Sequence, residues 1–183
     1  MEVLKSTLPE VLIIAPKRLG DHRGFFIELF QAERYASIGI RFPFVQDNLS
    51  RSSRGVLRGL HLQYPNAQSK LVTVLRGRVL DVAVDVRRGS PNFGKSVAIE
   101  LSECNGYQVF VPRGFAHGFV VLSDFADLHY KCDSFYSPRD EIAVRWSDPA
   151  LGINWEITEP TVSERDAAAP LLRDIHRLPT YEG

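Results

Sequence analysis

Cysteine, methionine and tryptophan are scarce in this chain, and long apolar runs are missing. The 183 residues include two cysteines, one methionine and two tryptophans. Cys104 and Cys132 form no Cys-x-x-Cys pair and lack the spacing of metal ligands, so we expect reduced thiols. The apolar run from Val11 to Ala15 is too short for a signal core or a membrane span. These features predict a cytoplasmic protein that does not enter a membrane.

An excess of charge of either sign is also missing. The chain carries 22 basic and 22 acidic residues, and its sequence pI is near 7.0. A balanced surface exerts no long-range attraction on a polyanion, which argues against nucleic acid as a partner. The basic residues are 17 arginines and 5 lysines, and arginine forms the better fork for phosphate groups. Any phosphate contact is therefore expected to be local.

The chain has the length of a single domain, which we expect to span residues 1–183. Short β-forming runs alternate with Gly, Pro, Asn or Ser-Asp turns, and almost no helix separates them. This pattern favours an antiparallel sandwich or barrel over alternating strands and helices. Residues 17–24 are expected to form a charged turn. The expected strands are 11–15, 25–30, 44–50, 56–63, 71–75, 79–86, 97–101, 108–111, 118–122, 127–132 and 142–146.

Two short helices are expected near the two ends of the chain. Residues 31–38 form the first, and Gly39 has the position of a C-terminal cap. The second begins at Ser163, because Asp166 follows three residues later and a run of alanines leads to a proline. In the strand 79–86 the apolar even-numbered residues share one face, predicted to be core. Asp81 and Asp85 are expected on the other face.

A charged site is expected within the predicted sheet between Ser53 and Gly77. Here His61, Arg58 and Lys70 lie among strand-forming residues. Arg58 and His61 are three apart and would face opposite sides of a regular strand, so we expect Gly59 to form a bulge that re-aims one of them. Basic side chains on a buried face require solvent or an anionic ligand nearby.

Two half-motifs resemble the signature motifs of the cupin superfamily, whose members are small jelly-roll barrels. Gly55 and His61 belong to the first, and the second is a G-x5-P-x-G-x2-H pattern that ends at His117. Metal-binding cupins carry a second histidine and a glutamate in the first motif. Here Gln63 replaces that histidine, and the glutamate region reads Gln-Ser-Lys. Two imidazoles beside the positive charge of Lys70 are a poor cation site, so we expect no metal and no cofactor.

A series of flanking segments extends the resemblance over residues 9–170. In order they are D-H-R-G-F-F-I-E, F-V-Q-D-N-L-S-R-S, G-V-L-R-G-L-H-L-Q, Q-S-K-L-V-T-V-L-R-G-R-V-L-D-V-A-V-D-V-R, G-S-P-N-F-G, V-P-R-G-F-A-H-G-F-V-V-L, Y-K-C-D-S-F-Y-S-P, W-S-D-P and S-E-R-D-A-A-A-P. The chain thereby resembles the dTDP-4-dehydrorhamnose 3,5-epimerases, metal-free cupin enzymes of dTDP-L-rhamnose biosynthesis. This implies a mainly β, cupin-type jelly-roll barrel with a few short helices. It also implies an isomerase that epimerises C3 and C5 of dTDP-4-dehydro-6-deoxy-D-glucose to dTDP-4-dehydro-L-rhamnose by general acid and base catalysis.

Four residues are the candidate catalytic groups. His61 is the candidate base, because imidazole titrates near neutrality and can accept a proton. The resemblance implies that Asp166 holds the other ring nitrogen of His61, although Asp166 can equally be a helix-cap carboxylate. Asp81 and Asp85 are the alternative partners of His61. Lys70 suits stabilisation of an enolate oxygen. Tyr130 is the acid candidate by resemblance, since a phenol is protonated at neutral pH and can donate to a carbanion.

The resemblance also implies a binding site for the dTDP-linked 4-keto-6-deoxyhexose. Arginine forks suit its diphosphate and an aromatic side chain suits its thymine, on which Tyr136 is expected to stack. Members of the family are homodimers in which an N-terminal segment pairs with the partner's sheet and brings residues near Arg23 and Glu28 into the neighbouring site. The expected binding residues are Arg23, Glu28, Gln46, Asn48, Arg58, His117, Tyr136, Glu141 and Arg165.

Three alternatives remain from the sequence. The protein can invert only C3 or only C5 of a dTDP-4-keto-6-deoxyhexose in another deoxysugar pathway. It can be a non-catalytic cupin that binds sugar nucleotides, against which the complete set of His61, Lys70 and Tyr130 argues. A metal-dependent cupin oxygenase is the third, and Gln63 disfavours it.

Overall fold

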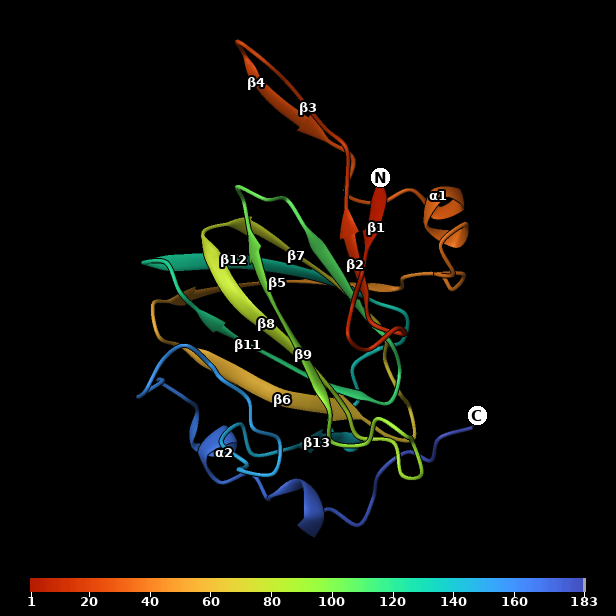
Figure 1. Cartoon of the computed structure of the whole chain (residues 1–183), viewed down its shortest axis with the longest axis vertical. Helices are drawn as coiled ribbons and strands as arrows, with labels where there is room; N and C mark the ends of the chain where they lie inside the picture. The colour runs from red at the N-terminus through yellow and green to blue at the C-terminus, as the bar shows by residue number, and fades with distance from the viewer. Residues whose placement is uncertain (183) are drawn as a thin grey trace.

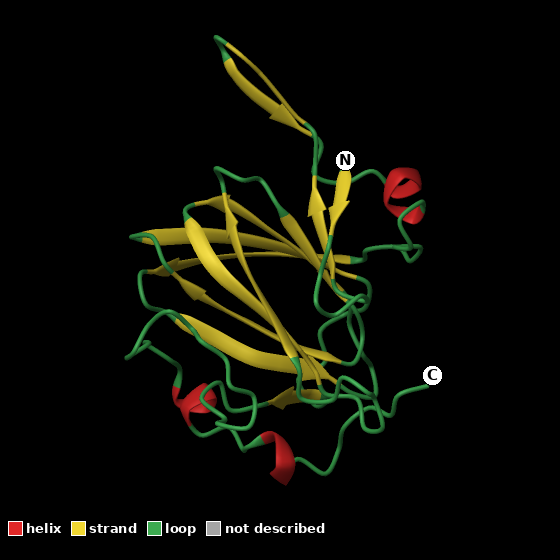
Figure 2. Cartoon of the chain, in the orientation of Figure 1, coloured by secondary structure: helices red, strands yellow, loops and turns green. Residues whose placement is uncertain are grey.

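The computed structural model describes residues 1–182, and strands dominate it (Figure 2). The strands are β1 (Glu2–Leu4), β2 (Leu12–Ala15), β3 (Arg18–Asp21), β4 (Gly24–Ile27), β5 (Gln46–Ser53), β6 (Leu57–Gln63), β7 (Lys70–Arg76), β8 (Arg78–Asp85), β9 (Ser96–Ser102), β10 (Gln108–Val111), β11 (Phe115–Val121), β12 (Phe125–Cys132) and β13 (Glu141–Ala143). The helices are α1 (Ala32–Ala36), α2 (Glu164–Ala167) and the 3-10 helix η1 (Leu172–Asp174).

The strands form two facing sheets and a separate hairpin. The six-stranded sheet has the order β1-β2-β10-β7-β12-β5, and the five-stranded sheet has the order β13-β6-β11-β8-β9. Neighbouring strands within both sheets are antiparallel. Figure 1 shows the sheets as the two walls of a barrel, with α2 and η1 below the five-stranded wall. The predicted antiparallel sandwich or barrel is confirmed.

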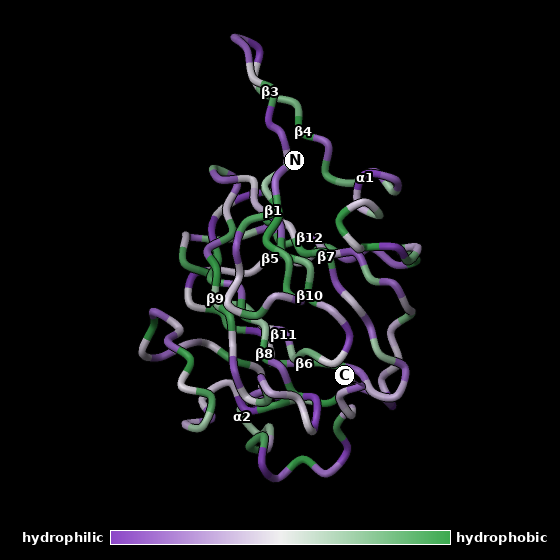
Figure 3. Tube along the Cα trace, turned by 45° about the vertical axis from the view of Figure 1, so that its right-hand side comes forward, coloured by the Kyte–Doolittle hydropathy of each residue, from purple (hydrophilic) through white to green (hydrophobic). Residues whose placement is uncertain are grey.

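Apolar residues fill the barrel and also cover the outside of both walls. One cluster lies between the sheets and includes Val72, Ala83 and Leu128. A second packs the outer face of the five-stranded sheet against the C-terminal segment, including Trp155. A third packs α1 on the six-stranded sheet through residues that include Tyr35. In Figure 3 hydrophobic segments accordingly follow the barrel strands.

Apolar residues cover both faces of the five-stranded sheet, and one expectation about β8 is therefore wrong. The face with Asp81 and Asp85 was predicted to lie opposite the core, but both carboxylates are buried, with 1% and 0% of each residue exposed. Their face is the barrel interior, and the apolar even-numbered face packs under the C-terminal segment. A carboxylate in this position requires hydrogen-bond partners, because burial of an unpaired charge is costly.

The hairpin β3–β4 extends away from the barrel (Figure 1). The prediction of a turn over residues 17–24 is wrong, since Arg18–Asp21 is a strand, and the strand expected over residues 25–30 ends at Ile27. Leu19, Phe25 and Phe26 are more than half exposed, at 52%, 58% and 67%. The hairpin therefore presents apolar side chains that its own barrel does not cover.

Strand β1 and the 3-10 helix η1 were not predicted, and the remaining elements agree with the prediction apart from their ends. Helix α1 begins after Gln31, whose side chain accepts a hydrogen bond from the Arg34 amide at 2.6 Å. The strand expected at 142–146 is shorter, at Glu141–Ala143, and β11 begins earlier than expected, at Phe115. In residues 1–182 no helix has the length and apolar character needed to cross a membrane.

Candidate active site

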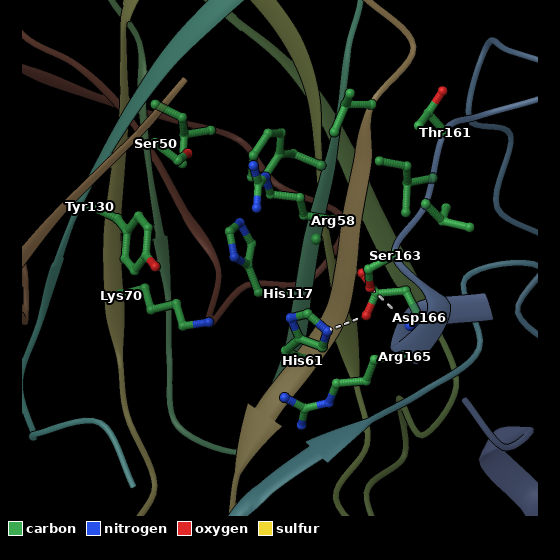
Figure 4. A pocket seen from close by; sticks show the side chains of 16 residues that line it. Ser50, Arg58, His61, Lys70, His117, Tyr130, Thr161, Ser163, Arg165 and Asp166 are labelled. Atoms are coloured by element: carbon green, nitrogen blue, oxygen red, sulfur yellow. Dashed lines mark hydrogen bonds and ion pairs between the residues drawn. The ribbon is translucent and has the colours of Figure 1, made fainter. Parts of the chain in front are cut away.

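A cavity of about 480 Å³ opens between the two walls of the barrel (Figure 4). His61 on β6 and His117 on β11 line it from the five-stranded sheet. Lys70 on β7 and Tyr130 on β12 line it from the six-stranded sheet. Figure 4 shows Tyr130 and Lys70 across the cavity from His61. A ligand in this cavity therefore meets different chemical groups on its two sides.

A bulge in β6 brings Arg58 and His61 to the same cavity, as predicted. Arg58 pairs with Phe119 and His61 pairs with His117. Between these two pairs β6 therefore has one residue more than β11, which is a bulge. Gly59 has a φ of 111°, and a Cβ there would lie 2.6 Å from the His117 carbonyl oxygen. Only glycine combines this backbone conformation with so close an approach of the strands.

Asp166 is the carboxylate within hydrogen-bond distance of His61, the partner that the resemblance implied. Asp166 Oδ1 lies 2.6 Å from His61 Nε2, and the Gly59 amide donates to Asp166 Oδ2 at 3.3 Å. Ser163 caps α2 by accepting a hydrogen bond from the Asp166 amide at 3.1 Å. Burial raises the pKa of Asp166, but the contacts with His61 and Gly59 outweigh burial and leave that pKa below its usual value. Asp166 thus belongs to a helix start and also holds the imidazole.

Lys70 and Tyr130 lie on the opposite wall without strong polar partners. Within residues 1–182 the Lys70 ammonium forms no ion pair or hydrogen bond, and it lies 5.8 Å from the centre of the Tyr130 ring. Burial lowers the pKa of Lys70. Burial also raises the pKa of Tyr130, so this phenol keeps its proton at neutral pH. The wall can therefore supply both a positive charge and a proton donor.

A second imidazole and carboxylate pair stands beside the first. His117 Nε2 lies 2.9 and 3.0 Å from the two oxygens of Asp81. Asp81, an alternative partner for His61 in the sequence analysis, contacts His117 instead. The other alternative partner, Asp85, binds Arg87 and Ser90. Sequence spacing gives no sign of the His117 contact, although a carboxylate in an apolar strand signals a buried partner.

A second cavity of about 310 Å³ shares His61, Lys70 and Tyr130 with the first and is lined by further polar groups. The residues expected to bind the nucleotide that line it are Gln46, Asn48, Tyr136 and Glu141. Tyr136 donates to Glu141 at 2.6 Å, and Arg165 does the same at 2.6 Å. Burial raises the pKa of Glu141, but these two contacts outweigh it and keep that pKa low.

Arg58 lies at the rim of the first cavity. It donates to Ser52 at 3.0 Å, and this contact with β5, which the sequence analysis missed, joins the two sheets.

Arg23 and Glu28 are the two predicted site residues that line neither cavity of this chain. Arg23 pairs with Asp21 at the exposed end of the hairpin, and Glu28 pairs with Arg34.

Two histidines alone offer few ligands for a metal ion. Each has one ring nitrogen within hydrogen-bond distance of a carboxylate, and Gln63, which stands where metal-binding cupins carry a further histidine, is hydrogen-bonded to backbone groups. Residues 1–182 contain no cluster of three or more His, Cys, Asp or Glu side chains arranged to ligate a cation. The donors present do not fit a metal centre, and the metal-free site stays a prediction.

Together the fold and site define a cupin-type enzyme of the acid–base class, with a carboxylate-held imidazole opposite a phenol and an ammonium. Comparison with known proteins gives the family. The model of the dTDP-4-dehydrorhamnose 3,5-epimerase family matches residues 5–174. The chain belongs to this family of isomerases, as its motifs indicated.

Relatives extend over almost the whole chain. The dTDP-4-dehydrorhamnose 3,5-epimerase of Salmonella typhimurium is 50% identical over 175 residues, covering 94% of this chain and 96% of that protein. The Legionella pneumophila epimerase RmlC, solved with dTDP-4-keto-L-rhamnose, superposes with a TM-score of 0.97 at 50% identity, covering 100% and 99% of the two chains. ChmJ of Streptomyces bikiniensis, a 3'-monoepimerase solved with dTDP-quinovose, has a TM-score of 0.88 at 40% identity, covering 93% and 89%.

Proposed function

We propose that this protein epimerises C3 and C5 of dTDP-4-dehydro-6-deoxy-D-glucose and forms dTDP-4-dehydro-L-rhamnose. The observation that supports this most directly is the division of groups between the walls, with His61 on one sheet and Tyr130 on the other. Inversion of a carbon requires a proton to leave one face and another to arrive on the opposite face. A pyranose between the walls meets a base on one side and an acid on the other.

His61 removes the proton. Asp166 accepts the hydrogen on Nε2, so Nδ1 keeps its lone pair and faces the cavity (Figure 4). A carbon next to the C4 ketone is acidic because the resulting charge moves to the ketone oxygen. Asp166 then stabilises the imidazolium that forms, and solvent accepts its proton before the next cycle.

Lys70 stabilises the enolate, and Tyr130 protonates the opposite face. An ammonium already fixed in a cavity needs no reorganisation when negative charge develops on the oxygen. The raised pKa of Tyr130 keeps the phenol protonated until the enolate carbon accepts its hydrogen, after which solvent restores the phenol. C3 and C5 both neighbour the ketone, so the same three groups serve each carbon in turn.

The nucleotide occupies the second cavity and the rim. Arg58 and Arg165 pair with the diphosphate or sugar, His117 contacts the same region, and Tyr136 stacks on thymine. Gln46, Asn48 and Glu141 complete this part of the site. The protein acts as one domain in the cytoplasm, in agreement with its free cysteines.

A homodimer completes the site. The hairpin β3–β4 exposes Phe25 and Phe26, and apolar side chains on an extended hairpin are stabilised by a covering partner. A second copy then brings its own Arg23 and Glu28 to the site of its partner. Sedimentation of the purified chain tests the dimer, and a monomer at micromolar concentration contradicts it.

Deuterium exchange tests the reaction and separates it from its nearest alternative. The protein is incubated with the keto sugar in deuterated water, and label is located by NMR. Label at both C3 and C5 supports the double epimerase, while label at C3 alone supports an activity like the 3'-monoepimerase ChmJ. A complete lack of exchange contradicts the enzymatic function. His61→Ala is expected to abolish exchange and leave dTDP affinity nearly intact, whereas Arg58→Ala weakens dTDP binding most.

A further inference from the structure

The connection between β12 and β13, residues 133–140, presents an aromatic side chain to the second cavity and lies outside the three apolar clusters. We call residues 133–140 the aromatic loop. Phe135 and Tyr136 are 70% and 49% exposed, and no residue of the loop belongs to any of the three apolar clusters. A loop outside the apolar clusters depends largely on hydrogen bonds for a fixed conformation.

Gln63 supplies two of these hydrogen bonds. Its Oε1 accepts from the Ser137 amide at 2.8 Å, and its Nε2 donates to the Phe135 carbonyl at 3.3 Å. The same Nε2 also donates to the Asn66 carbonyl at 2.8 Å. Gln63 is 5% exposed, so little water is available to replace these contacts. The two bonds with the loop bracket Tyr136 on both sides along the backbone.

Two further glutamines hold the residues between these points. Gln46 Oε1 accepts from the Tyr136 amide at 2.9 Å, and Gln68 Nε2 donates to the Ser134 carbonyl at 2.6 Å. The three glutamines come from β5, from β6 and from the segment before β7. We call Gln46, Gln63 and Gln68 the glutamine clamp. Side-chain amides thus bind four consecutive loop residues, Ser134 to Ser137, through the main chain.

Carboxylates fix both ends of the same loop. Asp133 accepts from the Ser69 amide at 2.7 Å, and Asp140 accepts from Asn66 and Ser137 at 2.5 and 2.8 Å. The Tyr136 hydroxyl donates to Glu141 at 2.6 Å. Both the backbone and the outer end of the Tyr136 side chain are therefore held, while about half of the residue remains exposed.

We propose that Gln63 and Gln68 are positioning residues that fix the ring plane of Tyr136 before the substrate binds, and thereby set its affinity for the nucleobase. This rests on the proposed function, in which the ligand carries thymine. A ring held in its binding orientation loses little conformational freedom when a base stacks on it. Gln63 stands at the position where metal-binding cupins carry a ligand histidine. In this chain that position supports a nucleotide-binding loop.

The test is a double-mutant cycle with dTDP as the probe, measured by calorimetry on the full chain. Gln63→Met keeps the length of the side chain and removes its hydrogen bonds, and we expect about tenfold weaker dTDP binding. In a Tyr136→Ala background the same substitution should change the affinity less than about twofold, because its effect passes through the ring. Inorganic pyrophosphate, which lacks a base, should bind equally to Gln63→Met and to the parent protein.

Kinetics and a control complete the experiment. Gln63→Met should raise KM about tenfold and change kcat less than about twofold, since His61, Lys70 and Tyr130 are unchanged. Asn154→Ala removes an amide that binds the Glu156 backbone in a turn outside both cavities, and it should leave dTDP affinity unchanged. If Gln63→Met does not fold, Gln68→Met takes its place in the same cycle.

Two results overturn the proposal. Equal losses of dTDP affinity in the two Tyr136 backgrounds mean that Gln63 acts independently of the ring, and unchanged affinity means that the clamp does not position it. A parent protein that fails to bind dTDP contradicts the proposed function instead, so the two failures are distinguishable.

Discussion

The contact between His61 and Asp166 supports a quantitative prediction for Asp166→Asn. The carboxylate accepts at two places, from the Gly59 amide and from His61 Nε2. An asparagine side chain has one oxygen for these two donors. If the oxygen stays with Gly59, the NH₂ group faces His61 Nε2, which must then accept a hydrogen bond. The ring proton moves to Nδ1, the nitrogen that must be free to remove a proton from the sugar.

The expected loss of rate follows from this geometry. The Asp166 side chain is only 4% exposed, so the charge-assisted hydrogen bond at 2.6 Å is shielded from water. Such a bond contributes about 1.5–3 kcal/mol, which corresponds to a rate loss of about 10- to 150-fold. The wrong tautomer adds to this cost, because only a minor population of His61 then has a free Nδ1. We expect exchange at C3 and C5 to slow by about 100-fold or more.

The assay is the rate of deuterium entry at C3 and C5 under saturating substrate, measured by NMR for the parent and Asp166→Asn. Affinity for dTDP serves as the control, because Asp166 acts on the imidazole and not on the nucleotide. It should change less than about twofold. A loss of exchange smaller than about threefold, with the protein folded, refutes the assignment of Asp166 as the group that orients the base.

Three further predictions concern the opposite wall and the stability of the barrel. Lys70→Met should slow exchange about 100-fold or more. It should also raise the melting temperature by about 2–4 °C, the shift that corresponds to about 1 kcal/mol, because it removes a half-buried ammonium that has no ion pair within residues 1–182. Tyr130→Phe should slow product formation about 100-fold or more, while His61 still returns solvent deuterium to the original face, so that label accumulates in unreacted substrate by NMR. For Asp85, burial raises the pKa but hydrogen bonds from Arg87 outweigh it, so the folded-state pKa lies below the unfolded one. Its stabilisation is present at neutral pH and is lost as the pH falls below about 4, so thermal melts of Asp85→Asn should depend less on pH in that range.

Local signals in the sequence predicted the part of the site that one strand or one helix start determines. The bulge at Gly59 follows from the need to bring Arg58 and His61 to one side, and the helix start at Ser163 follows from its side chain and Asp166. Both depend on residues close together in the chain. The pairing of Asp166 with His61 required the family resemblance, because more than a hundred positions separate them.

Features that depend on what covers a strand were not predictable in the same way. The residues of β3 have no apolar alternation, because the hairpin does not pack on its own barrel, and so they resembled a turn. In β8 the alternation was real, but the C-terminal segment covers the face that would otherwise meet water. The roles of Asp81 and Gln63 depend on groups from other strands, and no spacing along the chain encodes those contacts.

The pairing of the two histidines explains how a cupin frame can work with protons. His61 and His117 face each other across neighbouring strands, yet their side chains differ in exposure, at 26% and 7%. Each has one nitrogen within hydrogen-bond distance of a carboxylate, and the ammonium of Lys70 on the facing wall favours an anion in the cavity. The more exposed imidazole can exchange protons with the ligand, while the buried one is held as a fixed donor or acceptor. In the proposed function, the same frame that holds a metal ion in other cupins provides a base and an anion-binding group.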